Sequence, residues 1–213
     1  MFQIPDFEKL DELAAKLMKD RQAHVDRETG SVYYHGQRVA KLAMTLRGIV
    51  LPDEPDWDTA LRLAGMFHDV GKGLKPHSHY GALIFRDAVR GLAEPALIDK
   101  AAELIEAHCD RRPAEPVYDA PARILQDADL LDHFGTYEIW MNINYQAKHN
   151  KSILDALQHM DDFFDHYVDR HRALLNYPVS VAIYDDKAQF LWQFRERLRR
   201  EANGELYRIP DVP

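Results

Sequence analysis

Two residues suited to metal binding and acid–base chemistry, His68 and Asp69, stand side by side at the end of an apolar segment, directly before Gly71, Lys72 and Gly73. Such a pair carries no information by itself, because chance predicts one in a chain with 11 histidines and many aspartates. Its setting does carry information, since a buried carboxylate beside a buried imidazole is costly unless the two are paired or bind a metal ion. The segment therefore indicates either a metal site or a capped, purely structural helix end.

The side chains of His68 and Asp69 can reach one ion most easily if the helix that carries them ends near this pair, because adjacent helical residues point about 100° apart. Gly71 favours such a stop, because glycine commonly ends helices. We therefore expect the pair at the C-terminal end of a central helix, with Lys72 in a glycine loop beside it.

Three further side chains with ligand chemistry lie on predicted helices of their own. His35 begins an amphipathic run, His108 closes another on its apolar side, and Asp129 is embedded among apolar residues. Imidazoles and carboxylates without a thiolate suit borderline divalent ions, namely Mn, Fe, Co, Ni or Zn. A pure magnesium site would use oxygen ligands and few histidines.

The chemistry of such an ion leads to phosphate hydrolysis. A bound divalent ion can polarise a phosphoryl oxygen and activate water. Asp69 would then orient that water or accept its proton. Lys72, and with it Arg38, would hold phosphate oxygens and stabilise the developing charge. We expect Asp69 and Lys72 to be catalytic, and Lys72 and Arg38 to bind substrate.

The elements that must position these residues are helices, because the apolar residues recur with helical spacing almost throughout the chain. Pro5 and Asp6 are a start signal for a first helix. Further helices are expected over residues 32–50, 57–69, 79–91, 96–109, 119–132, 135–147, 151–175 and 185–203. Only the segment 179–183, with its β-branched residues, could be extended. The pattern predicts an all-α protein with the site on its central helices.

The order of the candidate ligands points to a known family. His35, His68, Asp69 and Asp129 follow one another as in the HD superfamily of metal-dependent phosphohydrolases, which the chain resembles. The sequence His-Asp-Val-Gly-Lys at 68–72 is similar to the central motif of that family. The resemblance implies an all-α HD-domain fold and hydrolase activity.

The likeness extends over roughly residues 31–135, or about half of the chain. Within it, Leu-Gln-Asp-Ala-Asp-Leu-Leu-Asp at 125–132 looks like the family's last motif. The C-terminal run 186–194 is similar to the tail of small stand-alone bacterial members that cleave nucleotides. We therefore expect one domain over residues 1–213, with the C-terminal helices packing on the motif-bearing core.

The resemblance assigns the metal ligands residue by residue. It makes four side chains the ligands of one ion: His35, His68, Asp69 and Asp129. Dinuclear members of the family add two histidines, which correspond here to His77, four residues before a glycine, and to His108. His79 could take the place of His77, and Cys109 stands where some dinuclear relatives have another histidine. Whether the centre holds one or two ions is left open.

The substrate is less well defined than the metal centre. Nucleotide-cleaving relatives tend to have arginines where this chain has Leu130 and Met141, which counts against a triphosphate. We expect hydrolysis of a phosphate ester or anhydride in a small substrate, with a nucleotide favoured. The alternatives are a cyclic-dinucleotide phosphodiesterase and a non-catalytic sensor that binds a metal ion and a nucleotide.

The other histidines do not suggest a second site. One polar stripe at helical spacing has an apolar face opposite it and is predicted to be a solvated surface: Asp155, His159, Asp162 and His166. Surface or packing roles are expected for four more: His24, His133, His149 and His171.

Composition narrows the class of protein. The formal net charge of −8 argues against a nucleic-acid scaffold. A single cysteine allows no internal disulfide and indicates a reducing compartment. The acidic residues in 1–10 do not fit a signal peptide, and no apolar run approaches the roughly 20 residues of a membrane span. We expect a cytoplasmic protein without a membrane partner and leave its oligomeric state open.

Overall fold

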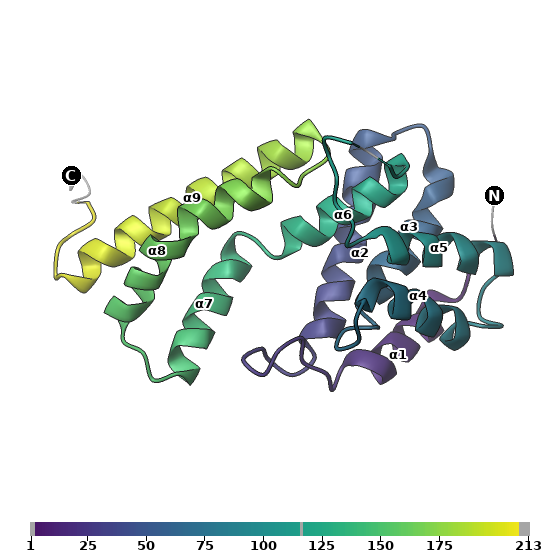
Figure 1. Ribbon diagram of the computed structural model, residues 1–213, viewed down its shortest axis with the longest axis horizontal. Helices are drawn as coiled ribbons and strands as arrows, with labels where there is room; N and C mark the ends of the chain where they lie inside the picture. The colour runs from purple at the N-terminus through teal and green to yellow at the C-terminus, as the bar shows by residue number, and fades with distance from the viewer. Residues whose placement is uncertain (1–2, 116, 209–213) are drawn as a thin grey trace, which may run out of the picture.

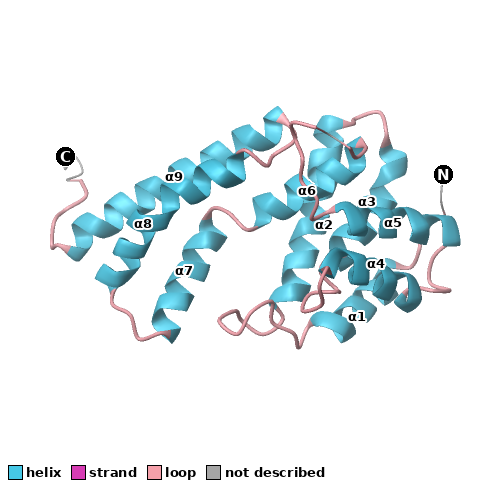
Figure 2. Ribbon diagram, viewed as in Figure 1, coloured by secondary structure: helices cyan, strands magenta, loops and turns pink. Residues whose placement is uncertain are grey.

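The computed structural model describes residues 3–115 and 117–208, so the two ends of the expected 1–213 domain lie outside it. Within this part of the chain all regular secondary structure is helical, as Figure 2 shows, apart from one isolated bridge between Arg90 and Ala93. The elements are α1 (Phe7–Met18), α2 (Ser31–Val50), η1 (Pro55–Trp57), α3 (Asp58–Phe67), α4 (His77–Ala88), α5 (Pro95–Ala107), α6 (Ala120–Asp132), α7 (Thr136–Lys148), α8 (Ile153–Arg172) and α9 (Pro178–Ala202). The predicted all-α fold is confirmed.

Helix α3 lies at the centre of the core, which we define as α1–α6 (Figure 1). It is buried on most sides, as its apolar sequence predicts. Glycines bring α2 and α3 into close contact: a Cβ on Gly36 would lie 2.5 Å from the carbonyl oxygen of Met66, and one on Gly65 would lie 2.5 Å from Cα of Ala40. This close approach places the residue before Gly36, which is His35, next to the end of α3.

The helix ends follow local sequence signals. Asp6 caps α1 by accepting hydrogen bonds from the backbone N–H groups of Glu8 and Lys9, as the start signal predicts. Helix α3 ends at Phe67, two residues before the predicted end. The chain then continues in tight turns, in which Lys72 N–H donates to the carbonyl of Asp69 at 2.9 Å. His68 and Asp69 therefore leave the regular helix, which frees both side chains to face one point.

Helices α7–α9 form a C-terminal arm that projects from the core (Figure 1). Helices α8 and α9 run antiparallel along each other, and α9 ends at the far tip of the arm. Of the polar stripe predicted on α8, Asp155, Asp162 and His166 are exposed. His159 of the same stripe is half-buried and lines a cavity. The opposite side of α8 is buried through Leu157 and other apolar residues.

Aromatic packing joins the arm to the core. Phe134, which follows α6, stacks on Tyr184 of α9 with 4.1 Å between ring centroids, and α8 contributes Phe164 and Tyr167 to the same stack. The hydroxyl of the fully buried Tyr184 donates to the carbonyl of Val168. That hydrogen bond joins α9 to α8 within the arm, whereas the stack on Phe134 and the hydrogen bond from Lys187 Nζ to the carbonyl of Leu131, at 2.6 Å, join the arm to the core.

The expectation that residues 179–183 could be extended is wrong, because this segment forms the first turns of α9. Pro178 at the first helical position has the backbone angle that a helix requires. The carboxylate of Asp127 in α6 accepts hydrogen bonds from the N–H groups of Asn176 and Tyr177, just before the helix. These tertiary contacts override the β-propensity of the segment.

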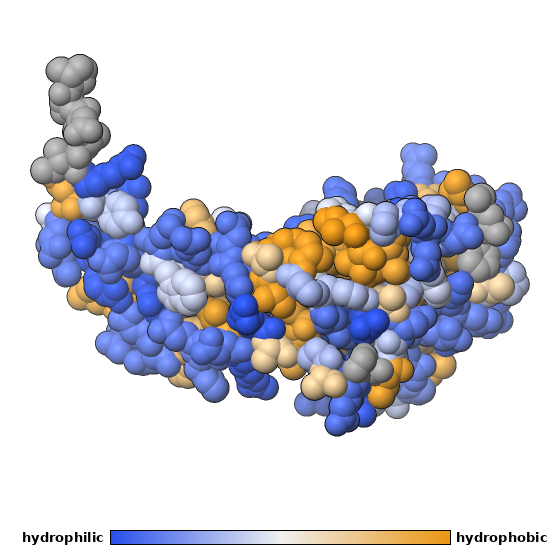
Figure 3. Space-filling view, turned by 90° about the horizontal axis from the view of Figure 1, so that it is seen from above, coloured by the Kyte–Doolittle hydropathy of each residue, from blue (hydrophilic) through white to orange (hydrophobic). Residues whose placement is uncertain are grey.

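None of the described helices is both long and apolar enough to cross a membrane. Seen from above, hydrophobic residues gather in the middle of the surface, where the arm meets the core (Figure 3). Hydrophilic residues cover most of both ends in this view.

Candidate metal centre

Four side chains of the core bring their donor atoms to one point, and we call them the inner set: His35, His68, Asp69 and Asp129. They come from α2, from the turn after α3 and from α6. His35 Nε2 lies 3.1 Å from His68 Nε2 and 3.0 Å from Asp129 Oδ1. Asp69 Oδ2 lies 3.9 and 3.8 Å from the same two imidazole nitrogens.

The donor atoms of His35, His68 and Asp129 lie within 4.8 Å of one another, as the ligands of one ion do. Asp69 lies at the edge of this group. Two donors that are each about 2.1 Å from a metal and about 90–110° apart lie about 3.0–3.4 Å from each other. All four side chains are buried, at 0–7% residue exposure. Two carboxylates and two imidazoles thus have the chemistry and the spacing to hold a divalent transition-metal ion.

The imidazole rings are oriented with Nε2 free for an ion. His68 and His108 each place Nδ1 against the backbone carbonyl three residues earlier, at 2.9 and 2.6 Å. His35 places Nδ1 2.7 Å from a carboxylate oxygen of Asp132. With the ring proton on Nδ1, the lone pair on Nε2 faces the cluster, which is how protein surroundings usually prepare a histidine ligand.

Asp69 connects the inner set to a second group of donors. Its Oδ2 faces the inner set, whereas its Oδ1 lies 3.2 Å from His77 Nε2 and 3.8 Å from His108 Nε2. His77 is the first residue of α4, and this helix start packs against Gly71, where a Cβ would be 2.3 Å from the carbonyl oxygen of His77. The two oxygens of the Asp69 carboxylate therefore face different groups of donors.

The structure separates the two alternatives for this second group. His79 is exposed and places Nδ1 3.0 Å from a carboxylate oxygen of Glu106. His77 and His108 instead face each other with their Nε2 atoms 3.2 Å apart. The chain brings His77 and His108 to Asp69 and directs His79 elsewhere.

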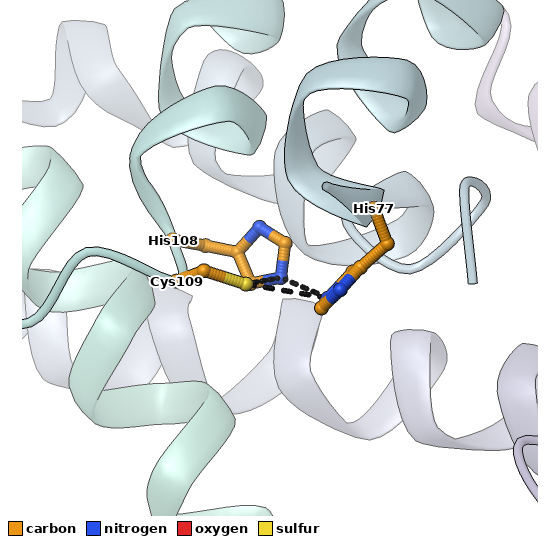
Figure 4. Close-up of side chains that lie close together, drawn as sticks. All are labelled: His77, His108 and Cys109. Carbon is orange, nitrogen blue, oxygen red and sulfur yellow. Dashed lines mark hydrogen bonds between the residues drawn. The ribbon is translucent and has the colours of Figure 1, made fainter. Parts of the chain in front are cut away.

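Cys109 stands beside these two histidines, and we call the three residues the outer triad: His77, His108 and Cys109. Its Sγ lies 3.3 Å from His77 Nε2 and 3.2 Å from His108 Nε2 (Figure 4). Although burial raises the pKa of the Cys109 thiol, hydrogen bonds to both histidines outweigh this and lower the pKa to about 6. The three donor atoms have the spacing of a metal site.

The electrostatics of the inner set favour a cation. Burial raises the pKa of Asp129, but Arg111 and the histidines outweigh it and hold that pKa well below its usual range. Burial would lower the pKa of His35, yet hydrogen bonds to Asp129 and Asp132 raise it to about 9. Several buried carboxylates thus attract positive charge to one place, which a metal ion can supply.

Two cations lie at the partly open side of the centre. Lys72 Nζ is 3.1 Å from Asp69 Oδ2, and its side chain is 32% exposed. Arg111 donates from Nη2 to Asp129 Oδ2, and its side chain is 18% exposed. Both can reach a phosphate group that approaches the ligands from solvent.

Arg38 occupies a different place from the one its predicted role suggests. Its Nε and Nη2 both donate to the carboxylate of Asp132 at 2.8 Å, and its guanidinium lies over the ring of Tyr137. It also lines a groove of about 500 Å³ together with Lys41 and Lys187. Direct binding of phosphate by Arg38 stays a prediction, and the observed contact orients Asp132 and through it His35.

Three residues of the centre were not identified from the sequence: Arg111, Asp132 and His133. Asp132 and His133 follow Asp129 by three and four positions, a spacing that puts them on the same helix face. This spacing could have predicted that both residues lie at the centre. The surface or packing role expected for His133 leaves out its contact with His35. Its ring lies 4.4 Å from that of His35, and burial lowers its pKa to about 3. Arg111 lies in a loop and had no comparable signal.

Comparisons with known proteins agree with this architecture. Residues 32–133 match the model of the HD domain family. A predicted HD superfamily hydrolase from an uncultured Thermotogales bacterium has 16% sequence identity and a TM-score of 0.63, with 94% of this chain and 95% of the other covered. An HD-superfamily hydrolase from Bacillus thuringiensis has 18% identity and a TM-score of 0.64, with 93% and 99% covered.

A third structure is Bacillus subtilis YpgQ, which was crystallised in complex with ADP. It has 16% identity and a TM-score of 0.59, with 92% of this chain and 95% of YpgQ covered. No curated protein matches the chain. At these identities the solved structures show a common fold over nearly the whole chain.

Proposed function

Because residues 32–133 belong to the HD domain family, we propose that the chain is a metal-dependent phosphohydrolase acting on a phosphate ester or anhydride of a small nucleotide. The observation that carries the proposal is the inner set. The buried donor atoms of His35, His68 and Asp129, from three separate segments, lie within 4.8 Å of one another. Asp69 lies beside them, and both imidazoles are held with Nε2 directed inward. A purely structural ion pair would not need this arrangement.

In this proposal the inner set holds Mn, Fe, Co, Ni or Zn, and the residues around it prepare the substrate. The ion would act as a Lewis acid on a phosphoryl oxygen and on water. Asp69 serves as ligand and orients the attacking water. Its pKa is well below the usual range, since the nearby histidines and Lys72 outweigh the effect of burial. As a carboxylate beside that water, Asp69 could also accept its proton.

Lys72 and Arg111 would bind the phosphate oxygens and stabilise the negative charge that develops during hydrolysis. Both lie against ligand carboxylates and are partly open to solvent. Arg111 offers a positive charge that buried Leu130 does not supply. The structure of YpgQ with ADP supports a nucleotide as the substrate class. The single cysteine, which indicates a reducing compartment, supports a cytoplasmic location.

The test combines metal analysis with a substrate screen. Purified protein should carry a transition metal, and metal-free protein should be stabilised by added Mn, Fe, Co, Ni or Zn. A panel of nucleotides, cyclic dinucleotides and a generic chromogenic phosphodiester is then assayed with added Mn. We expect release of phosphate or of a nucleoside monophosphate that depends on the metal.

A protein without bound metal and without stabilisation by any of these ions would contradict the proposal. Metal binding and nucleotide binding without turnover would instead favour the sensor alternative. Preferential cleavage of a cyclic dinucleotide would favour the phosphodiesterase alternative.

A further inference from the structure

The outer triad has a donor set that differs from that of the inner set. Figure 4 shows Cys109 and His108 entering from the turn after α5, while His77 enters from the start of α4. The three donor atoms form a nearly equilateral triangle, because the Nε2 atoms are 3.2 Å apart and Sγ lies 3.2 and 3.3 Å from them. Asp69 Oδ1, 3.2 Å from His77 Nε2, adds a fourth donor on one side.

We propose that Cys109 is a thiolate ligand of a second ion, held by the outer triad together with Asp69, and that this half of the centre prefers zinc or cobalt to manganese. The inference rests on the proposed function, because it concerns the same centre. A thiolate is a soft ligand that favours zinc over hard ions, whereas the inner set contains only nitrogen and oxygen donors. The two halves would therefore differ in the ion they select.

The geometry fits such an ion without rearrangement of the chain. In tetrahedral coordination, nitrogen and sulfur donors about 2.05 and 2.3 Å from zinc lie about 3.3–3.6 Å apart. The observed sides of 3.2–3.3 Å are within a few tenths of an ångström of that range. Asp69 Oδ1 approaches the triad from its His77 side, 3.2 Å from His77 Nε2 and 3.8 Å from His108 Nε2, and would be the fourth ligand that links this ion to the inner set.

Hydrogen bonds among the three side chains cannot satisfy all three donor atoms of the outer triad at once. His108 is 1% exposed, and its Nδ1 faces the carbonyl of Ile105, which leaves the lone pair on Nε2 directed into the triangle. A thiol has one proton, but its sulfur faces two imidazole nitrogens at nearly equal distances. One cation can satisfy all three donors at once. Cys109 is exposed as a whole residue, so an ion can reach it from solvent.

The test uses cobalt as a spectroscopic probe of the full-length protein. Metal-free protein is titrated with cobalt(II), and the near-ultraviolet band of thiolate-to-cobalt charge transfer is followed. We expect two ions per chain and a band that belongs to one of them. Cys109→Ser should lose the band and bind zinc at that position at least about 100-fold more weakly, the upper range for changing even an indirect partner of a ligand.

Two histidines on α4 provide a test variant, His77→Ala, and its matched control, His79→Ala. His77→Ala should weaken the band, whereas His79→Ala should leave it unchanged, because His79 faces Glu106. Alkylation provides a second readout, since Cys109 is the only cysteine of the chain. Saturating zinc should prevent its modification by iodoacetamide, as followed by mass spectrometry.

Two results would overturn the inference: a second cobalt ion that binds without a thiolate band, or alkylation of Cys109 that zinc does not slow. Hydrolysis is measured in parallel with manganese. Wild type that hydrolyses nucleotides but shows no band contradicts only the role of Cys109. A band without hydrolysis under any metal contradicts the proposed function and leaves the thiolate site standing.

Discussion

Helices α6 and α7 are consecutive and of equal length, yet they differ in almost every other respect. In α6 every residue except Ala120 and Arg123 is buried, including three aspartates. In α7 the one buried residue is Gln146, and Trp140 is 53% exposed. The core therefore keeps its charges in the interior, where each needs a partner, whereas the arm keeps most of its polar groups at the surface.

This contrast suggests a division of labour. Buried charges in the core act on one another strongly, because the local dielectric is low, and together they create the metal centre. The arm is joined to the core through an aromatic stack and carries no residue of the inner set or the outer triad. We therefore expect changes in the core centre to affect activity more than stability, and changes in the arm to do the reverse.

The largest expected effect is that of Asp69→Ala. The substitution removes a carboxylate shared by both halves of the centre, so kcat/KM should fall by at least about 10³-fold, more than the loss of one charged donor to a transition state. Circular dichroism should show the same helical content, because the side chain makes no apolar contacts that hold the core together. Full activity in a folded variant would show that the His-Asp pair is structural.

The next effect concerns the arm. Tyr184→Ala removes a fully buried ring that stacks on Phe134, and we expect a loss of about 3–5 kcal/mol in the free energy of unfolding, the range for large aromatic truncations. Urea denaturation measures it. Tyr184→Phe is the matched control and should cost about 1 kcal/mol, because it removes only the hydrogen bond to Val168. A loss of hydrolysis in folded Tyr184→Phe would contradict the proposed division.

The third prediction concerns Lys72 of the core, and Lys72→Ala tests whether this lysine binds the substrate. We expect kcat/KM to fall by roughly 10²-fold, the scale of one lost charged stabiliser, with the metal content unchanged. Lys75→Ala, on the same loop but exposed, serves as control and should behave as wild type. Loss of metal from the Lys72 variant would show that this lysine supports the ligand Asp69 and not the substrate.

The contrast between core and arm also explains what could be predicted from the sequence. Helical periodicity indicated the all-α fold, because most of the helices bury one face. The order of the inner-set residues was visible because each ligand stands within an apolar stretch, where a polar residue is conspicuous. His133 shares a helix face with Asp129 and could have been found by its spacing.

Other features depend on contacts that no local pattern reveals. Arg111 meets Asp129, and Cys109 meets His77, only because separate segments fold together. The helical start of α9 depends on hydrogen bonds from the preceding residues to Asp127, 49 and 50 positions away. Such tertiary contacts override local propensity, so the sequence alone indicated a possible extended segment there.

The smallest effect concerns a half-buried carboxyl group in the arm. Glu138 lines a cavity of about 240 Å³ between α7, α8 and α9, where His159, Tyr167 and Arg195 also face the space. Burial raises its pKa to about 7, and Arg27 offsets this only in part. Here the arm resembles the core, because it holds an ionisable group away from water.

The sign of the pH dependence follows from the raised pKa. In the unfolded chain the group ionises near 4.5, its ordinary pKa, and in the folded protein near 7. Between these values the folded state binds more protons, so stability falls as the pH rises through this window. Glu138→Gln removes the effect and should be more stable than wild type above pH 7, by on the order of 2 kcal/mol, with no difference below pH 4. Urea midpoints measured from pH 4 to 8 test this, with the exposed Glu12→Gln as control. If the stability difference between Glu138→Gln and wild type stayed constant across that range, Glu138 would have the same pKa in the folded and unfolded states. The arm, unlike the core, would then hold no ionisable group away from water.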